Sequence, residues 1–231
     1  MHVLISNDDG IKAPALFFLK EFFENRNDKV TIVVPNENRS AAGMSLSLSK
    51  PMKVEENGDC IFSVDGTPCD CINYALTVLN NKYDLVLSGI NEGSNVGQEI
   101  WYSGTIAAAR LANFNGYPTM SISLDKTKLT KSEWKNVFMN LDFYFNDWLK
   151  QVSKKHTMNI NLPKKATEQI CEAIETIVGN RKYINHLVFN KNKDGYIYEG
   201  EIIKSNSKKN YDNYAIENSK ISITYLENNI L

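Results

Sequence analysis

The sequence predicts an α/β protein in which a mostly parallel sheet is covered by helices on both faces, with a β-hairpin appendage in the C-terminal part. Apolar runs such as residues 3–5 are continuous rather than alternating, which is typical of strands buried on both faces of a parallel sheet. Strand-like and helix-like segments alternate over the first half, as in right-handed βαβ units. Asp194 and Gly195 lie between two aromatic-rich segments and indicate a hairpin.

The first half supplies most of the predicted sheet. Its strands are short runs rich in apolar and β-branched residues, and its helices place apolar residues three and four positions apart. Thr67 and Pro68 mark one helix start, because threonine is a favoured N-cap and proline a favoured first residue. The expected strands are 1–6, 29–35, 52–55, 61–64, 83–88 and 119–124, and the expected helices are 13–25, 68–80 and 105–114.

The second half begins with a long helix, which we expect to be capped by Ser132 and to run to about Val152. A strand over 157–162 stops at Pro163, and lysine and asparagine then become frequent. We therefore expect one domain, with an α/β body over 1–163 and a β-rich appendage over 164–231. Within the appendage we expect strands at 183–189, 196–203 and 221–226 and a polar loop at 205–213, while 170–178 fits either a helix or a strand.

The composition is that of an ordinary globular protein, with 231 residues of which 42% are hydrophobic and 23% charged. The formal net charge of -1 gives no electrostatic reason to expect a nucleic-acid partner or a membrane surface. Neither a secretory signal pattern nor an apolar run of about 18 residues is visible. We therefore expect a cytoplasmic protein without a membrane anchor.

Cysteine and histidine give no sign of a zinc site or of nucleophilic catalysis. The four cysteines include no C-x-x-C pair and are expected to be idle thiols in a reducing compartment. The three histidines, His2, His156 and His186, lie beside no plausible nucleophile. A Ser-His-Asp or Cys-His hydrolase is therefore disfavoured.

Two adjacent carboxylates, Asp8 and Asp9, directly follow the first predicted strand. In an open α/β sheet, ligands bind in the crevice outside the carboxyl ends of the strands. Two neighbouring negative charges there require a cation, and oxygen ligands favour Mg²⁺, Mn²⁺ or Ca²⁺. Loops after two other strands add the hydroxyl of Ser40 and the carboxamide of Asn91. Together these groups predict a site for a hard divalent cation with open positions for water.

Ser103, Gly104 and Thr105 precede a helix with an apolar face and predict an anion site. Free backbone N–H groups and the positive end of the helix dipole both favour a phosphate there. The Gly- and Asn-rich loop 89–97, which contains Asn95, allows backbone and amide groups to approach a ligand closely. A metal beside a phosphate-binding helix end indicates phosphoryl chemistry, with a bound water made nucleophilic by the metal.

Taken singly, each feature also has a simpler structural interpretation. Ser103 or Thr105 can serve only as a helix cap, Asn91 and Asn95 can hold a turn, and Arg39 can be a surface charge. Other phosphate-binding classes fit less well, because neither a G-x-G-x-x-G after the first strand nor a Walker A loop is present. An aspartyl-phosphate phosphatase needs D-x-D, whereas the two carboxylates here are adjacent.

Five short motifs, in order over about the first 125 residues, resemble the SurE family of survival-protein nucleotidases. Each motif alone is weak, but the set is specific. Residues 159–163 and 221–224 extend the likeness more weakly into the C-terminal part. The five motifs are Ser6-Asn7-Asp8-Asp9-Gly10, Asn38-Arg39-Ser40, Gly66-Thr67-Pro68, Ser88-Gly89-Ile90-Asn91 and Tyr102-Ser103-Gly104-Thr105.

The resemblance implies a Rossmann-like α/β fold with a protruding hairpin near 183–203, and subunits that assemble as homodimers or homotetramers. It also implies a phosphomonoesterase that depends on one divalent metal ion per subunit, Mg²⁺ or Mn²⁺, with Ca²⁺ as a substitute in crystals. Its substrates would be nucleoside 5′-monophosphates, with 3′-monophosphates left open. The implied metal ligands are Asp8, Asp9, Ser40 and Asn91, of which the two carboxylates are also the catalytic pair, and the implied phosphate-binding residues are Asn95, Ser103, Gly104 and Thr105.

The chain departs from the family pattern at Leu111, where an acidic residue is more common, and at Glu99, where aspartate is common. It also ends at Leu231, soon after the last predicted strand, so the C-terminal helix usual in the family is expected to be absent. Two alternative functions stay open at the same site: a short-chain exopolyphosphatase, and a non-catalytic nucleotide-binding or regulatory protein.

Overall fold

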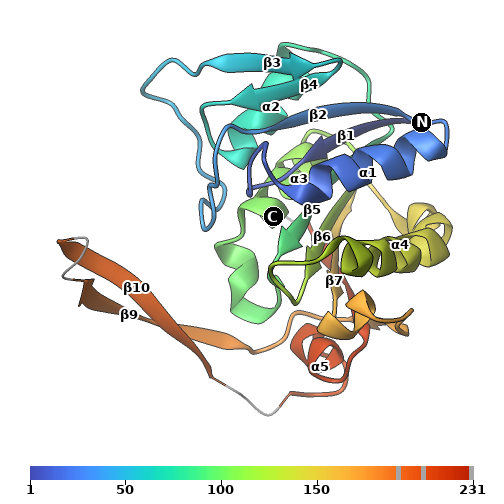
Figure 1. The fold of residues 1–231 in the computed structure, drawn as a ribbon, viewed down its shortest axis with the longest axis vertical. Coiled ribbons are helices and arrows are strands. Elements are labelled where there is room, and N and C mark those ends of the chain that lie inside the picture. The colour runs from blue at the N-terminus through green and yellow to red at the C-terminus, as the bar shows by residue number, and fades with distance from the viewer. Residues whose placement is uncertain (191–193, 204–206, 229–231) are drawn as a thin grey trace.

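The computed structural model describes residues 1–190, 194–203 and 207–228, and it confirms the predicted α/β class (Figure 1). Its described strands form a nine-stranded sheet in the order β3-β4-β2-β1-β5-β6-β7-β11-β8 and a two-stranded sheet of β9 and β10. Within the larger sheet, the pairs are parallel except for β3 with β4 and β7 with β11.

The strands are β1 (His2–Ser6), β2 (Lys29–Pro35), β3 (Val54–Gly58), β4 (Ile61–Val64), β5 (Leu85–Glu92), β6 (Thr119–Leu124), β7 (His156–Leu162), β8 (Ala173–Thr176), β9 (Lys182–Asn190), β10 (Gly195–Ile203) and β11 (Ile221–Glu227). The α-helices are α1 (Pro14–Asn25), α2 (Pro68–Thr77), α3 (Gly104–Phe114), α4 (Lys131–Gln151) and α5 (Asp212–Glu217), and two 3₁₀ helices are η1 (Gly97–Trp101) and η2 (Lys164–Thr167).

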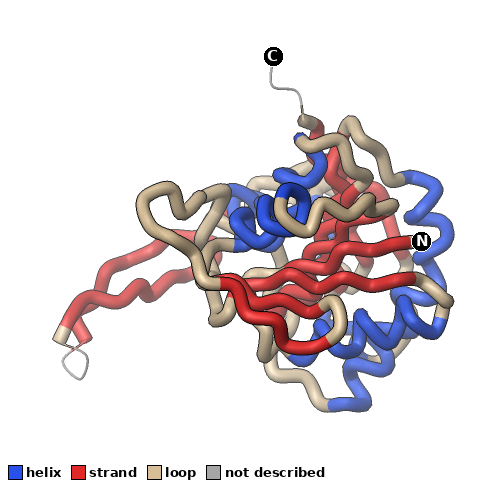
Figure 2. Tube along the Cα trace, turned by 90° about the horizontal axis from the view of Figure 1, so that it is seen from above, coloured by secondary structure: helices blue, strands red, loops and turns tan. Residues whose placement is uncertain are grey.

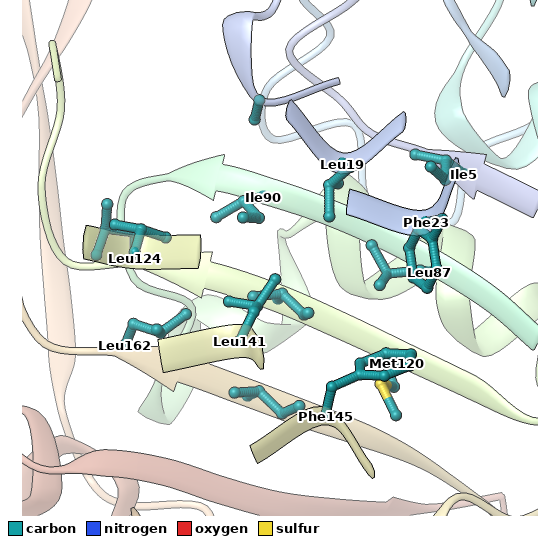
Figure 3. Close-up of a cluster of buried hydrophobic side chains, with 14 of the residues drawn as sticks. Ile5, Leu19, Phe23, Leu87, Ile90, Met120, Leu124, Leu141, Phe145 and Leu162 are labelled. Carbon is teal, nitrogen blue, oxygen red and sulfur yellow. The ribbon is translucent and has the colours of Figure 1, made fainter. Parts of the chain in front are cut away.

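Two apolar cores lie on opposite faces of the sheet. On one face α1 and α4 pack against the strands, with Leu19, Phe23 and Phe145 among the buried side chains (Figure 3). On the other face lie α2 and α3. In β1, Ile5 joins the first core and Leu4 the second, and both are fully buried. Burial on both faces is the reason why the first strand is a continuous apolar run.

The helix starts follow capping chemistry. Thr67 accepts a hydrogen bond from the backbone N–H of Asp70 at 3.1 Å, which confirms the predicted cap of α2. The prediction that Ser132 caps α4 is wrong, because Thr130 is the N-cap and Ser132 lies within the helix. Thr130 and Glu133 form a capping box, a pairing that satisfies two backbone N–H groups and therefore sets the start two residues earlier.

The C-terminal part contributes to both sheets. The predicted hairpin is confirmed, since β9 and β10 pair antiparallel from Asn190 opposite Gly195, and it projects away from the body (Figures 1 and 2). The strands β8 and β11 instead extend the nine-stranded sheet beyond β7. The ambiguous segment 170–178 thus contains a strand, and the division of the chain at residue 163 stays a prediction.

The predicted polar loop at 205–213 is partly replaced by α5, which begins at Asp212, while residues 204–206 lie outside the described part. Within the described ranges, no helix combines the length and the apolar character that crossing a membrane requires.

We expect Phe145→Ala to lower the free energy of unfolding by about 3–5 kcal/mol, because it opens a cavity in a fully buried core. Phe145 is 0% exposed, and its ring centroid lies 5.3 Å from that of Phe23. Phe143 is 62% exposed on the same helix, so Phe143→Ala is the matched control, with an expected loss of about 1 kcal/mol or less. Urea unfolding of both variants measures the difference, and equal losses would contradict this packing.

Candidate metal and phosphate site

The site lies at the edge of the sheet where the parallel strands β1, β2 and β5 end. The turn after β1 is held by Asn7, which is 1% exposed. Its side-chain amide donates to the carbonyl of Gly10 at 3.2 Å, and its side-chain oxygen accepts from the N–H of Gly10 at 3.0 Å. Gly10 has a φ of +89°, and a Cβ there would lie 2.8 Å from the carbonyl carbon of Glu37. This closed turn presents Asp8 and Asp9 at the strand end.

The loop after β2 is tied to both carboxylate residues. The N–H of Arg39 donates to the carbonyl of Asp8 at 2.7 Å. The side-chain amide of Asn38 donates to Asp9 Oδ1 at 3.3 Å, while its oxygen accepts from the N–H of Ser40 at 3.0 Å. Asn38 therefore links Ser40 to Asp9, and Ser40 is exposed at this rim. Sequence reasoning gave no role to Asn38, although it stands two residues before a predicted ligand.

The end of β5 brings Asn91 to the same edge. Ser88 pairs with Ser6 of β1, and the register with β6 shifts between Ser88 and Asn91. The Asn91 side-chain N–H donates to the carbonyl of Gly93 at 2.7 Å, so its nitrogen is engaged within its own loop. One residue further on, the backbone N–H of Glu92 acts to lower the pKa of Asp9. The predicted loop at 89–97 thus begins as strand, since β5 runs to Glu92.

The first turn of α3 contacts Asp8 directly. The hydroxyl of Thr105 donates to Asp8 Oδ1 at 2.5 Å. The backbone N–H groups of Gly104 and Thr105 also face this carboxylate and act to lower its pKa. A Cβ at Gly104 would lie 2.8 Å from Cβ of Asp8, so only glycine permits this approach. Ser103 is the N-cap of α3, and its hydroxyl oxygen accepts from the N–H of Ile106 at 3.1 Å.

The two carboxylates are both placed where negative charge is costly. Asp8 is 4% exposed, and burial raises its pKa although the N–H and hydroxyl donors of α3 act in the opposite direction. Burial, and then the charge of Asp8, raise the pKa of Asp9 to about 7. A pair of carboxylates with this environment is stabilised by a bound cation.

The donor set fits a hard divalent cation. Among the described residues, no cluster of three or more His, Cys, Asp or Glu side chains is placed to hold a metal ion. A cation at this edge would therefore take its ligands from two carboxylates, a hydroxyl and an amide oxygen, which suits Mg²⁺ or Mn²⁺ better than Zn²⁺. Beneath the site, the buried hydroxyls of Ser6 and Ser88 have no hydrogen-bond partner in the described part of the chain.

Asn95 is placed differently from the other predicted residues. It is 7% exposed, and its side-chain amide donates to the hydroxyl of Ser123 at 2.8 Å. Its backbone N–H donates to Asn161 Oδ1 at 2.7 Å, and its carbonyl accepts from the side chains of Asn159 and Asn161 at 3.0 and 3.1 Å. This network fixes the loop after β5 rather than leaving Asn95 open.

Sequence reasoning missed the role of Asn159 and Asn161. Both are fully buried in β7, where they alternate with apolar residues of the α1–α4 core. Two asparagines at alternate positions of a buried strand were the available signal, because buried amides need hydrogen-bond partners.

The fold and these contacts define a class of protein: an α/β protein with a carboxylate pair held against a helix N-terminus at the carboxyl edge of a parallel sheet. The family model described as "Survival protein SurE" matches residues 3–185. The chain belongs to the SurE family, as its motifs predict.

Curated relatives over nearly the whole chain carry the name "5'-nucleotidase SurE". One from Geobacter metallireducens is 34% identical over 235 residues, covering 98% of this chain and 91% of the relative. One from Prochlorococcus marinus strain MIT 9301 is 36% identical over 250 residues, covering 98% and 90%. The crystal structure of the SurE protein from Aquifex aeolicus is similar with a TM-score of 0.81 and 27% identity, covering 100% of this chain and 95% of that one.

We expect Asp9→Asn to stabilise the metal-free protein at high pH and not at low pH. The folded-state pKa of Asp9, about 7, lies above the ordinary aspartate value of 3.8, so the ionised carboxylate opposes folding above pH 7. Below that pH the folded protein holds the proton, and the penalty disappears as the pH falls toward 4. The gain at pH 8 is on the order of 2 kcal/mol.

Thermal unfolding in EDTA at pH 8 and pH 5 measures this gain. Asp142→Asn is the control, because the Asp142 side chain is 72% exposed on α4, and it should change the melting temperature little and equally at both pH values. A loss of stability in Asp9→Asn that is the same at pH 8 and pH 5 would contradict the electrostatic account.

Proposed function

We propose that this chain is a divalent-metal-dependent phosphomonoesterase that hydrolyses nucleoside 5′-monophosphates to nucleoside and phosphate. The name of its relatives supports the nucleotidase activity. The single structural observation that carries the proposal is the 2.5 Å hydrogen bond from Thr105 to Asp8. It joins the carboxylate pair, which suits a cation, to a helix N-terminus, which suits a phosphate.

Asp8, Asp9, Ser40 and Asn91 are the residues that would hold the metal. Their oxygen atoms come from three loops at one sheet edge, and Asn38 fixes two of these loops relative to each other. When bound, Mg²⁺ or Mn²⁺ supplies a Lewis acid that draws charge from phosphate oxygens and lowers the pKa of a water. The carboxylate of Asp8 or Asp9 orients the attacking water by accepting its hydrogen bond.

Ser103, Gly104, Thr105 and Asn95 form the proposed phosphate wall. The Ser103 hydroxyl oxygen accepts from a backbone N–H, so its own proton is free to be donated to a phosphate oxygen. The Thr105 hydroxyl donates a hydrogen bond to Asp8 and therefore holds the carboxylate in place. Gly104 allows Asp8 to approach the helix end, and Asn95 holds the neighbouring loop through its bonds to β6 and β7.

We also propose that copies of this chain associate as homodimers or homotetramers. The hairpin supports this, because it presents large apolar side chains away from the body. Tyr196 and Tyr198 on β10 are 70% and 73% exposed, and Leu187 and Phe189 on β9 are 57% and 48% exposed. Such a surface is stabilised when a second copy covers it.

Phosphate release from 5′- and 3′-mononucleotides and from short polyphosphate, with Mg²⁺, Mn²⁺ or EDTA, tests the proposal. We expect metal-dependent release that is greatest for 5′-mononucleotides and falls about 100-fold or more in Asp9→Asn. Asp142→Asn should retain full activity, and circular dichroism checks that each variant is folded. A folded wild-type protein that releases no phosphate with either metal would leave only a binding role, and greatest release from polyphosphate would favour the exopolyphosphatase.

A further inference from the structure

A cavity of about 250 Å³ lies beside the proposed phosphate wall. It shares Ser103 with that wall and extends along α3. Its remaining lining comes mainly from the loop after β2, from the end of η1 and from the next turns of α3. The lining residues that matter here are Met44, Trp101, Ser103, Ile106, Ala107 and Arg110.

Among the described residues that line this cavity, Arg110 is the one cation. Ser103, Ala107 and Arg110 lie on one face of α3, since residues four and seven positions apart share a face. Arg110 therefore lines the cavity from the same side of α3 as Ser103.

The guanidinium of Arg110 has an unmet need for hydrogen-bond acceptors. Its Nε is buried without a hydrogen-bond partner, and no acidic side chain in the described part of the chain forms an ion pair with it. Its guanidinium also makes a cation–π contact with Phe114, whose ring centroid lies 5.6 Å from Cζ. Since no described residue accepts a hydrogen bond from Arg110, its donors are available to a ligand that supplies acceptors.

The other walls of the cavity are apolar and aromatic. Trp101 is 66% exposed and Met44 is 45% exposed, which is unusual for such large apolar side chains at a site rim. The N–H of Gly43 donates to the carbonyl of Tyr102 at 3.0 Å, which holds the loop of Met44 against the turn of Trp101. An apolar slot with an exposed indole and one planar donor group suits a flat ring whose edge carries acceptors.

A nucleobase is a flat ring of this kind, and the donors and acceptors on its edge determine which base Arg110 can bind. Arginine donates but cannot accept, and its fork matches two adjacent acceptors. Guanine presents O6 and N7 as two acceptors on one edge, as does hypoxanthine, whereas adenine presents the N6 donor beside N7. The same cavity is adjacent to Ser103, so a nucleotide with its phosphate at α3 has its base within reach.

We propose that this cavity is the base subsite of the enzyme, in which Trp101 stacks on the base and Arg110 binds the O6 and N7 edge of a 6-oxopurine. The proposal rests on the proposed function and deepens it. It makes Arg110 a specificity-determining residue and predicts that GMP and IMP are preferred to AMP.

Values of kcat/KM for GMP, IMP, AMP and p-nitrophenyl phosphate test this assignment in the wild type and in Arg110→Met and Arg110→Lys. We expect the wild type to prefer GMP over AMP by about 10-fold or more, a typical effect of one bidentate contact. Arg110→Met should reduce the preference to about twofold, mainly through KM, and leave p-nitrophenyl phosphate unaffected. Arg110→Lys should also lose the preference, because it keeps the charge and not the fork. Lys135→Met on α4 is the surface control.

Three results would overturn the subsite. One is a ratio of kcat/KM for GMP to that for AMP that is unchanged in Arg110→Met. Another is an equal loss of kcat/KM for p-nitrophenyl phosphate in this variant, which would place Arg110 at the phosphate. The third is a loss of kcat/KM in this variant for short polyphosphate alone, which would make the cavity a second phosphate site.

If the wild type hydrolyses none of these substrates, the proposed function fails. Binding of GMP and AMP then still tests whether the cavity is a base subsite. Trp134 and Trp148 are buried, so quenching of the exposed Trp101 reports on the cavity. GMP should quench this fluorescence more strongly than AMP in the wild type and equally in Arg110→Met, and equal quenching in the wild type would reject the assignment.

Discussion

The contact between the Asp8 carboxylate and the first turn of α3 is the interaction on which the rest of the site depends. A buried carboxylate is unstable without donors, and α3 provides two backbone N–H groups and the hydroxyl of Thr105. These donors offset only part of the cost, since burial still raises the pKa of Asp8. Because Asp8 lies against the helix end, a phosphate bound there would rely on the Ser103 hydroxyl, and a cation held by the carboxylates would join them to that phosphate.

Close backbone approaches make this contact possible. Gly104 brings α3 against Asp8, and Gly10 brings the turn after β1 against the loop after β2. Gly89 lets β5 pass the carbonyl of Ile122, where a Cβ would lie at 2.3 Å. A side chain at Gly104 or Gly10 would separate two parts of the site, and one at Gly89 would separate β5 from β6. The glycines in the SurE motifs of this chain are therefore required for steric reasons that are independent of catalysis.

Local sequence patterns predicted the α/β class, most of the helices and strands, and the sheet edge at which Asp8 and Asp9 lie. Continuous apolar runs identified the buried strands, and Thr67 identified the start of α2, because both signals act over a few neighbouring residues. The start of α4, by contrast, depended on the choice between Thr130 and Ser132, which only the reciprocal bond with Glu133 decides. The sequence motifs contain Asn38, Asn159 and Asn161, but their bridging roles were not predicted, because each binds a partner far along the chain, up to 66 residues away for Asn161. Long-range hydrogen bonds of this kind leave no periodic signature.

The coupling between Mn²⁺ binding and inorganic phosphate binding shows whether Asp8 joins the cation site to the phosphate site. Calorimetric titration with Mn²⁺, with and without phosphate, measures it in the wild type, in Thr105→Val and in the surface control Thr77→Val. If Asp8 joins the cation site to the phosphate site, phosphate strengthens Mn²⁺ binding by about 10-fold. Thr105→Val then weakens Mn²⁺ binding and reduces its coupling to phosphate binding. Equal Mn²⁺ affinity with and without phosphate, unchanged by Thr105→Val, would contradict the account.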